Sequence, residues 1–169
     1  MARFIYWDTA LVVDDELSQN TLDAAKSLKP KNKDFKKGCI IGADEGDTNF
    51  MAKNKIDASD IYAAINQLNI IPYIESEEVE WWANFHSMSV GGKMAWHNDS
   101  NNSLAVSMYL GTCSGGQLQV LSPCGTQSVM ISPRENRIVV LKAETKHRVL
   151  EVEDGSRDSL QFFIRYINR

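Results

Sequence analysis

The chain has 169 residues, of which 43% are hydrophobic, and this is enough to bury one core without disulfide or metal staples. Its formal net charge of -4 and isoelectric point near 5.4 argue against a protein that grips nucleic acid mainly through a basic surface. No run of eighteen apolar residues occurs, the N-terminus lacks a long apolar segment, and the three cysteines show no pairing pattern, so we expect a soluble cytoplasmic protein with reduced thiols.

The first part of the chain is predicted to contain two short strands and two helices. Residues 3–7 and 11–13 have strand character, and a helix follows for which Asp14 is the expected N-cap and Pro30 the end. A second helix is predicted from Ser59, because apolar residues then recur at helical spacing on one face. We expect both helices to support a sheet from outside.

Two polar stretches separate these elements. Six lysines lie between residues 26 and 37, which we interpret as a solvated loop, the alternative being a contact with an acidic substrate or partner. Residues 38–42 resemble a strand, whereas residues 43–57 are polar and lack periodicity. Such a segment is either a mobile lid over a binding site or a plain surface loop.

The second part of the chain is predicted to form many short strands. Alternation and turn residues delimit them at 79–88, 104–110, 118–121, 126–132, 137–142, 147–152 and 159–167. This pattern is typical of a jelly roll. We therefore predict a mainly β (α+β) protein with one domain over residues 1–169: a double-stranded β-helix (jelly-roll or cupin-like) core at 79–167, with helical support within 1–78.

Three side chains of this core form a candidate metal site. His97 and Asp99 are two residues apart, so on a strand they leave the same face, and His147 can return from a neighbouring strand. Two imidazoles and one carboxylate form the facial arrangement of non-haem Fe(II) oxygenases. The His-x-Asp triplet alone is weak, because a histidine followed two residues later by an acid arises by chance roughly one time in eight.

A second cluster strengthens this interpretation. Arg157 and Ser159 follow His147 and share one strand face. The planar fork of an arginine suits a carboxylate, and a nearby hydroxyl can donate a further hydrogen bond. The pair is therefore a candidate clamp for the far carboxylate of a dicarboxylic cosubstrate.

With these motifs the sequence resembles the 2-oxoglutarate/Fe(II)-dependent oxygenases, and within them the prolyl 4-hydroxylase-like group. The resemblance covers about residues 80–167 and rests on His97-Asn98-Asp99, Met108-Tyr109-Leu110, Gly115-Gly116-Gln117-Leu118 and the stretch 147–160. It implies that His97, Asp99 and His147 bind Fe(II) as the catalytic centre. It also implies that Arg157, helped by Ser159, binds the distal carboxylate of 2-oxoglutarate.

The resemblance further implies a dioxygenase that uses O2, with ascorbate as a candidate reductant, to hydroxylate an unactivated C–H bond while releasing succinate and CO2. A proline within a peptide or protein is the first substrate to expect. The alternatives are another amino-acid side chain, a small metabolite, or a non-catalytic cupin-like module that binds metal and carboxylate. A nucleic-acid or membrane partner is not expected.

Several positions near the site depart from the family pattern or stay open. Met94 stands where the family usually has a tyrosine, and Ser87-Met88 where a second aromatic hydroxyl is common, so how the remaining cosubstrate oxygens are bound is open. We interpret His86 as a structural histidine, the alternative being a residue of the pocket, and Trp96 as core. By alternation we expect Tyr109 to point away from the face of Met108, so that its hydroxyl is not assigned to the pocket.

Overall fold

The computed structural model describes residues 2–31, 36–37, 49–72 and 77–168. The helices are α1 (Gln19–Ser27) and α2 (Ser59–Gln67), and the strands are β1 (Ala2–Tyr6), β2 (Ala10–Asp14), β3 (Lys36–Lys37), β4 (Phe50–Ile56), β5 (Glu77–Met88), β6 (Met94–His97), β7 (Leu104–Tyr109), β8 (Ser114–Gly115), β9 (Leu118–Leu121), β10 (Ser128–Ile131), β11 (Arg137–Lys142), β12 (His147–Val149), β13 (Val152–Asp154) and β14 (Arg157–Asn168). None of the described helices is long and apolar enough to cross a membrane.

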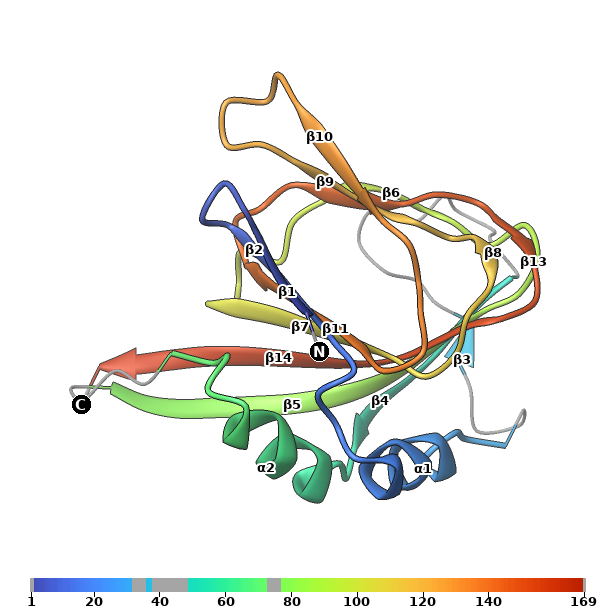
Figure 1. The fold of residues 1–169 in the computed structure, drawn as a ribbon, viewed down its shortest axis with the longest axis horizontal. Coiled ribbons are helices and arrows are strands. Elements are labelled where there is room, and N and C mark those ends of the chain that lie inside the picture. The colour runs from blue at the N-terminus through green and yellow to red at the C-terminus, as the bar shows by residue number, and fades with distance from the viewer. Residues whose placement is uncertain (1, 32–35, 38–48, 73–76, 169) are drawn as a thin grey trace.

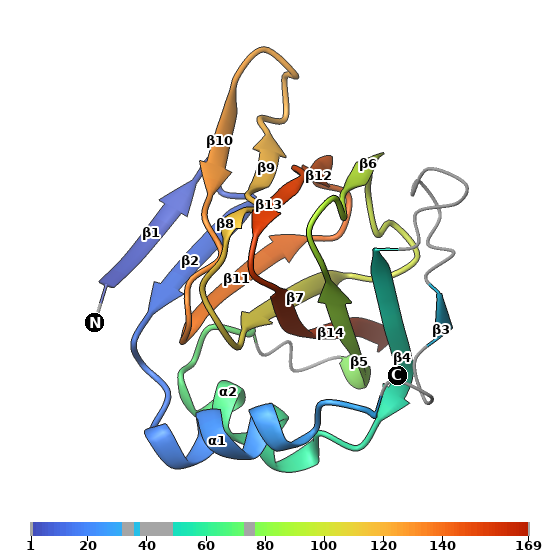
Figure 2. The same cartoon turned by 90° about the vertical axis from the view of Figure 1, so that its right-hand side faces the viewer.

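Two antiparallel sheets face each other and enclose the candidate site. Among the described residues, the main sheet has eight strands in the order β1-β2-β11-β7-β14-β5-β4-β3, and the minor sheet has four in the order β10-β9-β12-β6. Figures 1 and 2 show the minor sheet lying over the middle of the main sheet, with the short pair β8 and β13 at one end. The predicted mainly β, jelly-roll architecture is confirmed.

Strand β14 occupies the centre of the main sheet. It pairs with β5 along twelve residues and with β7 on its other side. Leu160, Phe162 and Ile164 belong to the core beneath the helices, whereas the alternate residues Gln161 and Phe163 face the space between the sheets. This alternation lets one strand serve both the hydrophobic core and the site.

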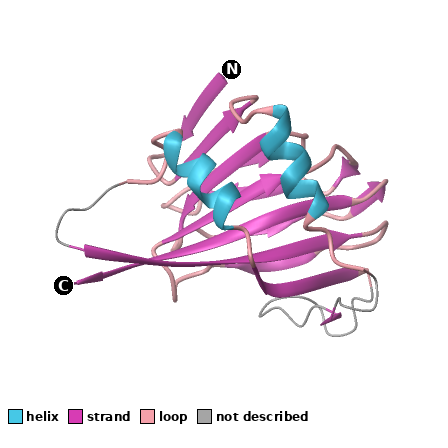
Figure 3. Ribbon diagram, turned by 90° about the horizontal axis from the view of Figure 1, so that it is seen from below, coloured by secondary structure: helices cyan, strands magenta, loops and turns pink. Residues whose placement is uncertain are grey.

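The two helices cover the outer face of the main sheet, as Figure 3 shows from below. Leu22 and Ala25 of α1 and Ile61 and Ile65 of α2 are buried there. The first 78 residues thus supply the expected helices, and in addition they supply strands to the main sheet.

The start of α1 differs from the prediction. Ser18 is the N-cap, and its side chain accepts a hydrogen bond from the backbone N–H of Thr21. Asp14, the expected cap, instead ends β2 and forms a buried ion pair with Arg137. A long-range partner overrode the local capping preference of this aspartate.

The polar stretches of the first part also differ from expectation. Residues 38–42 and 43–48 lie outside the described residues, and 50–56 form β4, which pairs with β5. The prediction of an irregular segment over 43–57 is therefore wrong for residues 50–56. Of the six lysines, Lys26 is in α1 and pairs with Glu135 at 2.7 Å, and Lys29 pairs with Asp158 at 2.6 Å. These two lysines make ion pairs within the chain.

Candidate metal and cosubstrate site

His97 and His147 face each other on neighbouring strands of the minor sheet. They are direct cross-strand partners on β6 and β12, and their ring centroids lie 4.3 Å apart. The Nδ1 atom of His97 lies 2.8 Å from the carbonyl oxygen of Ala95, and that of His147 lies 2.9 Å from the carbonyl oxygen of Thr145. Each carbonyl can accept only a proton-bearing nitrogen, so each Nε2 keeps its lone pair for a metal ion.

Asp99 completes the group just beyond β6. Its backbone N–H donates to the carbonyl of Ala143, and its own carbonyl accepts from the N–H of Asn102, which holds the turn in place. One carboxylate oxygen lies 3.5 Å from Nε2 of His147. The ligand atoms of His97, Asp99 and His147 all lie within 4.8 Å of one another.

Burial shapes the electrostatics of Asp99 and His147. It raises the pKa of the Asp99 carboxyl, against the opposing effect of His97. It also lowers the pKa of His147 to about 4, so this imidazole is neutral at physiological pH. A buried carboxylate beside a neutral imidazole is costly alone and favourable around a cation. The donor set therefore fits a divalent iron ion.

Arg157 reaches the same cavity from the start of β14 and is 3% exposed. Its Nε–H donates to the carbonyl of Gly116 at 2.9 Å, and its Nη2 donates to the Tyr109 hydroxyl at 3.0 Å. The guanidinium carbon also lies 4.9 Å from the centroid of the Tyr109 ring. These contacts fix the fork and leave its Nη1 side for an anionic ligand.

Ser159 lies beside the cavity in a short hydrogen-bonded row. Its hydroxyl accepts from Nε2 of Gln161 at 2.8 Å, while Oε1 of Gln161 accepts from the Ser107 hydroxyl at 2.6 Å. Ser159 is fully buried. Its own O–H proton stays available as a donor, because a hydroxyl can donate and accept at once.

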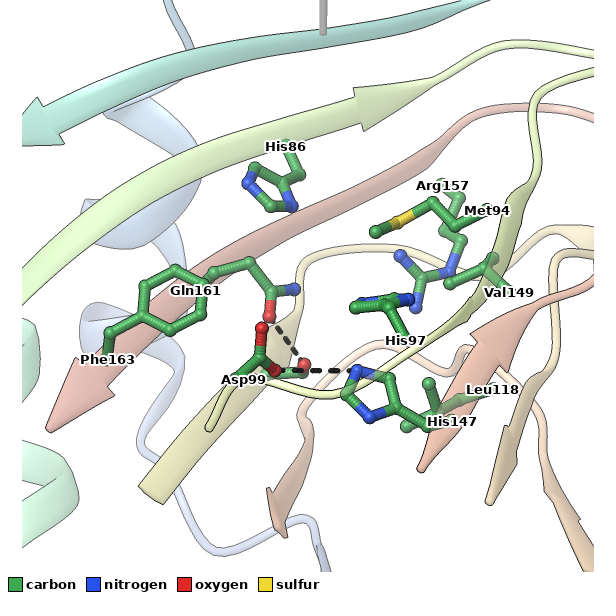
Figure 4. A pocket seen from close by; sticks show the side chains of 11 residues that line it. His86, Met94, His97, Asp99, Leu118, His147, Val149, Arg157, Gln161 and Phe163 are labelled. Carbon is green, nitrogen blue, oxygen red and sulfur yellow. Dashed lines mark hydrogen bonds and ion pairs between the residues drawn. The ribbon is translucent and has the colours of Figure 1, made fainter. Parts of the chain in front are cut away.

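Figure 4 shows the side chains of His97, Asp99, His147 and Arg157 around one cavity between the two sheets. Of the residues predicted from sequence, the structure places His97, Asp99, His147 and Arg157 on its wall and Ser159 next to it. The other lining residues are His86, Met94, Ser107, Leu118, Val149, Gln161 and Phe163. Gln161 and Phe163 were not predicted, although both continue the alternation that began with Arg157 and Ser159.

Two neighbouring residues differ from their predicted places, and a third has an unexpected partner. Tyr109 points away from the face of Met108, as expected, and does not line the cavity, but it is fully buried and its hydroxyl accepts a hydrogen bond from Arg157. His86 lines the cavity. Trp96 is only half-buried and lies under the guanidinium of Arg148, 4.8 Å from its ring centroid, which corrects its assignment to the core.

The comparisons with known proteins agree with this geometry. A family model described as the 2OG-Fe(II) oxygenase superfamily matches residues 83–165, which include all five predicted site residues. No curated protein sequence matches the chain.

Solved structures share the fold at low sequence identity. A Pseudomonas putida prolyl-4-hydroxylase has a TM-score of 0.71 at 19% identity, over 93% of this chain and 92% of that one. A Trichoplax adhaerens prolyl hydroxylase in complex with a hypoxia inducible factor peptide fragment scores 0.68 at 13%, over 95% and 84%. HygX from Streptomyces hygroscopicus, with nickel, 2-oxoglutarate and hygromycin B bound, scores 0.68 at 11%, over 94% and 84%. The chain is therefore similar to the 2OG-Fe(II) oxygenase superfamily in sequence over residues 83–165, and it shares the fold of these solved structures over most of its length.

Proposed function

We propose that residues 1–169 act as one oxygenase domain that hydroxylates an unactivated C–H bond, with a peptidyl proline as the preferred target. The observation that carries the proposal is the convergence of three ligand atoms within 4.8 Å on a cavity that Arg157 also lines. A site for a metal and a site for a carboxylate thus share one space. The proposal includes a reducing compartment that supplies ferrous iron and 2-oxoglutarate.

Each site residue has a defined task in this proposal. His97, Asp99 and His147 would hold Fe(II), and Arg157 with Ser159 would bind the distal carboxylate of 2-oxoglutarate. Bound iron and cosubstrate supply the oxidising chemistry, in which O2 and 2-oxoglutarate are converted to succinate and CO2 and the substrate gains a hydroxyl group. The chain itself binds and orients the reactants in a sheltered cavity, because reacting atoms held in place avoid the entropic cost of an encounter.

An aromatic shelf next to the cavity supports a ring-bearing substrate. We define the shelf as Trp82 of β5 together with Phe163 and Arg165 of β14. The Trp82 and Phe163 rings stack with centroids 5.8 Å apart, and Arg165 lies over Trp82 at 5.6 Å. Phe163 also lines the cavity. Flat apolar rings at this place suit the pyrrolidine of a proline.

A small-molecule substrate is the second candidate. HygX, which shares the fold, has hygromycin B bound in its structure, so this architecture accommodates a small molecule as well as the peptide fragment of the Trichoplax complex. A cupin-like module that binds metal and carboxylate without turnover is the candidate from another class.

Oxygen admission to the anaerobically loaded protein tests the proposal. Purified protein is mixed with Fe(II) and 2-oxoglutarate under nitrogen, air is admitted, and succinate is measured with a panel of proline-containing peptides. We expect one or more peptides to stimulate succinate formation and to gain the mass of one oxygen atom. Matched peptides with alanine in place of proline, and the Asp99→Ala protein, should give neither signal.

The other outcomes separate the candidates. Stimulation only by members of a small-molecule pool would replace the peptide substrate while keeping the oxygenase. Binding of Fe(II) and 2-oxoglutarate without succinate, across all peptides and pools, would instead support the binding module.

A further inference from the structure

His86 is a buried polar side chain whose ring has no hydrogen-bond partner among the residues that the structure describes. It is 6% exposed, and no other described residue donates to or accepts from its imidazole. The ring meets Phe50 edge to face, with centroids 5.1 Å apart and an interplanar angle of 90°. Buried polar groups are normally hydrogen-bonded, so an unpaired imidazole that lines a cavity indicates a ligand.

The ring lies on the wall of the cavity that the metal triad and Arg157 also line. On the main sheet His86 is opposite Ser159, and Arg157 is opposite Met88 two residues further along β5. Figure 4 shows the imidazole facing the cavity, with Arg157 towards one side and Gln161 towards the other. His86 is not in the group of described residues whose ligand atoms converge for a metal ion. It is therefore placed to contact a molecule that extends from the metal to Arg157.

The ring is a neutral donor and acceptor. Burial lowers the pKa of His86 to about 3, and the neighbouring Arg157 and His97 act in the same direction. A neutral imidazole carries one N–H and one free lone pair. It can donate to an oxygen atom without adding a charge that would compete with the metal ion.

2-Oxoglutarate, a five-carbon keto diacid, has more hydrogen-bond-accepting oxygen atoms than a metal ion and Arg157 can contact. Its far carboxylate suits Arg157, and its keto oxygen and one near carboxylate oxygen suit a metal ion. The second near carboxylate oxygen still needs a donor in this enclosed cavity. Met94 lines the cavity at the position where a tyrosine hydroxyl was expected, and its thioether cannot donate.

We propose that His86 is a cosubstrate-binding residue that donates its N–H to the carboxylate next to the keto group of 2-oxoglutarate. This inference rests on the proposed function and adds a contact to it. The imidazole reaches the cavity from β5, whereas the Met94 side chain, which enters from β6, has no group that can donate a hydrogen bond.

Ligand titration under nitrogen tests this role apart from turnover. The protein is loaded with Co(II), and calorimetry measures the affinity for 2-oxoglutarate and for 2-oxopentanoate, which has the keto acid end but no far carboxylate. His86→Phe keeps the ring shape without the donor. We expect it to weaken both ligands by a similar factor of about tenfold or more, because both share the end that His86 contacts.

Two further variants make the result specific. His86→Gln restores an N–H donor and should recover part of the lost affinity, whereas Arg157→Lys should weaken 2-oxoglutarate and leave 2-oxopentanoate nearly unchanged. Thermal unfolding and Co(II) affinity are measured for each variant. Unchanged affinity of His86→Phe for both ligands, with wild-type protein binding normally, would overturn the role of His86 alone. Wild-type protein that binds Co(II) but neither ligand would overturn the proposed function itself.

Discussion

The guanidinium of Arg157 is held in place by the protein around it. A carbonyl, a phenol hydroxyl and an aromatic ring contact it, and it is almost fully buried. A fixed fork loses little conformational entropy when it binds a carboxylate. The position of this one side chain therefore defines the length and orientation of the ligand that the cavity accepts.

Replacement of this arginine should separate cosubstrate binding from metal binding. Arg157→Lys keeps a positive charge but loses the fork, and we expect the affinity for 2-oxoglutarate to fall about 100-fold, or about 3 kcal/mol, while Fe(II) affinity is retained. Anaerobic titration of each ligand measures this. Arg148→Lys is the matched control, because Arg148 flanks His147 but its guanidinium lies over Trp96 rather than in the cavity. An equal loss of Fe(II) in Arg157→Lys would contradict the assignment.

The residues of the site differed in how far the sequence could predict them. The spacing of His97 and Asp99 is a local pattern, and their ligand atoms do converge, although His97 ends β6 and Asp99 lies just beyond it. The contact of Tyr109 with Arg157 was not predicted, because both faces of β7 are buried: Met108 packs beneath the helices and Tyr109 packs between the sheets. An alternation of apolar residues identifies two faces and does not tell which of them borders the cavity.

At the scale of elements, the turn that carries Gly115 and Gly116 supports the arginine clamp. Both glycines have positive φ angles, 71° and 63°. A Cβ atom at Gly116 would lie 3.1 Å from Cδ of Arg157 and 3.2 Å from Cγ2 of Val152. The bare backbone is needed for its carbonyl to reach Arg157.

A methyl group on this turn should therefore affect both stability and binding. We expect Gly116→Ala to lower the free energy of unfolding by about 2 kcal/mol and to weaken 2-oxoglutarate binding, because the Arg157 fork must move. Gly125→Ala is the control: its φ is 74°, and nothing lies within 4 Å of an added Cβ. Gly125→Ala should lower the free energy of unfolding, because alanine is strained at a positive φ, but it should keep the affinity for 2-oxoglutarate. Denaturant unfolding and anaerobic titration test both variants, and equal 2-oxoglutarate affinity in the two would argue against crowding of Arg157.

Strand β4 shows why some elements could not be predicted. Its second half is polar and exposed, with Lys55 at a positive φ of 52°. Its register with β5 shifts between Lys53 and Ile56, and the amide oxygen of Asn84 accepts from the N–H of Lys55. Pairing with a long neighbour, rather than local propensity, forms this strand. After residue 117, the strands predicted at 118–121 and 137–142 are confirmed, whereas the one predicted at 147–152 is divided into β12 and β13, which belong to different sheets.

At the scale of the whole molecule, Asp14 links the N-terminal strands to the rest of the main sheet. Both of its oxygens accept from Arg137, at 2.6 and 2.7 Å, and the aspartate side chain is 5% exposed. The hydrogen bonds from Arg137 lower the pKa of Asp14, in opposition to burial. The ionised form is therefore the one that the folded chain favours.

The ion pair between Asp14 and Arg137 should make the free energy of unfolding depend on pH. Because the pKa of Asp14 is lower in the folded chain than in the unfolded one, its contribution is present above the unfolded pKa of about 3.9 and is lost as the pH falls through the folded pKa. We expect Asp14→Asn to cost about 3 kcal/mol at pH 7 and progressively less below about pH 4. Denaturant unfolding across this range measures the difference.

Asp23→Asn is the control: it removes the same charge from the exposed surface of a helix and should change the free energy of unfolding little at either pH. A cost of Asp14→Asn that does not change with pH would contradict ionisation as its cause.

The ladder between β5 and β14 joins distant parts of the chain. Its register joins Met88 to Arg157 and Glu77 to Asn168, so the centre of the main sheet is closed by residues far apart along the chain. Such non-local pairing raises contact order and slows folding, because a long loop must close before the contacts form. A nascent chain that has not yet emerged past β14 leaves the inner edges of β5 and β7 without their partner. Those two bare edges are where self-association during synthesis would begin.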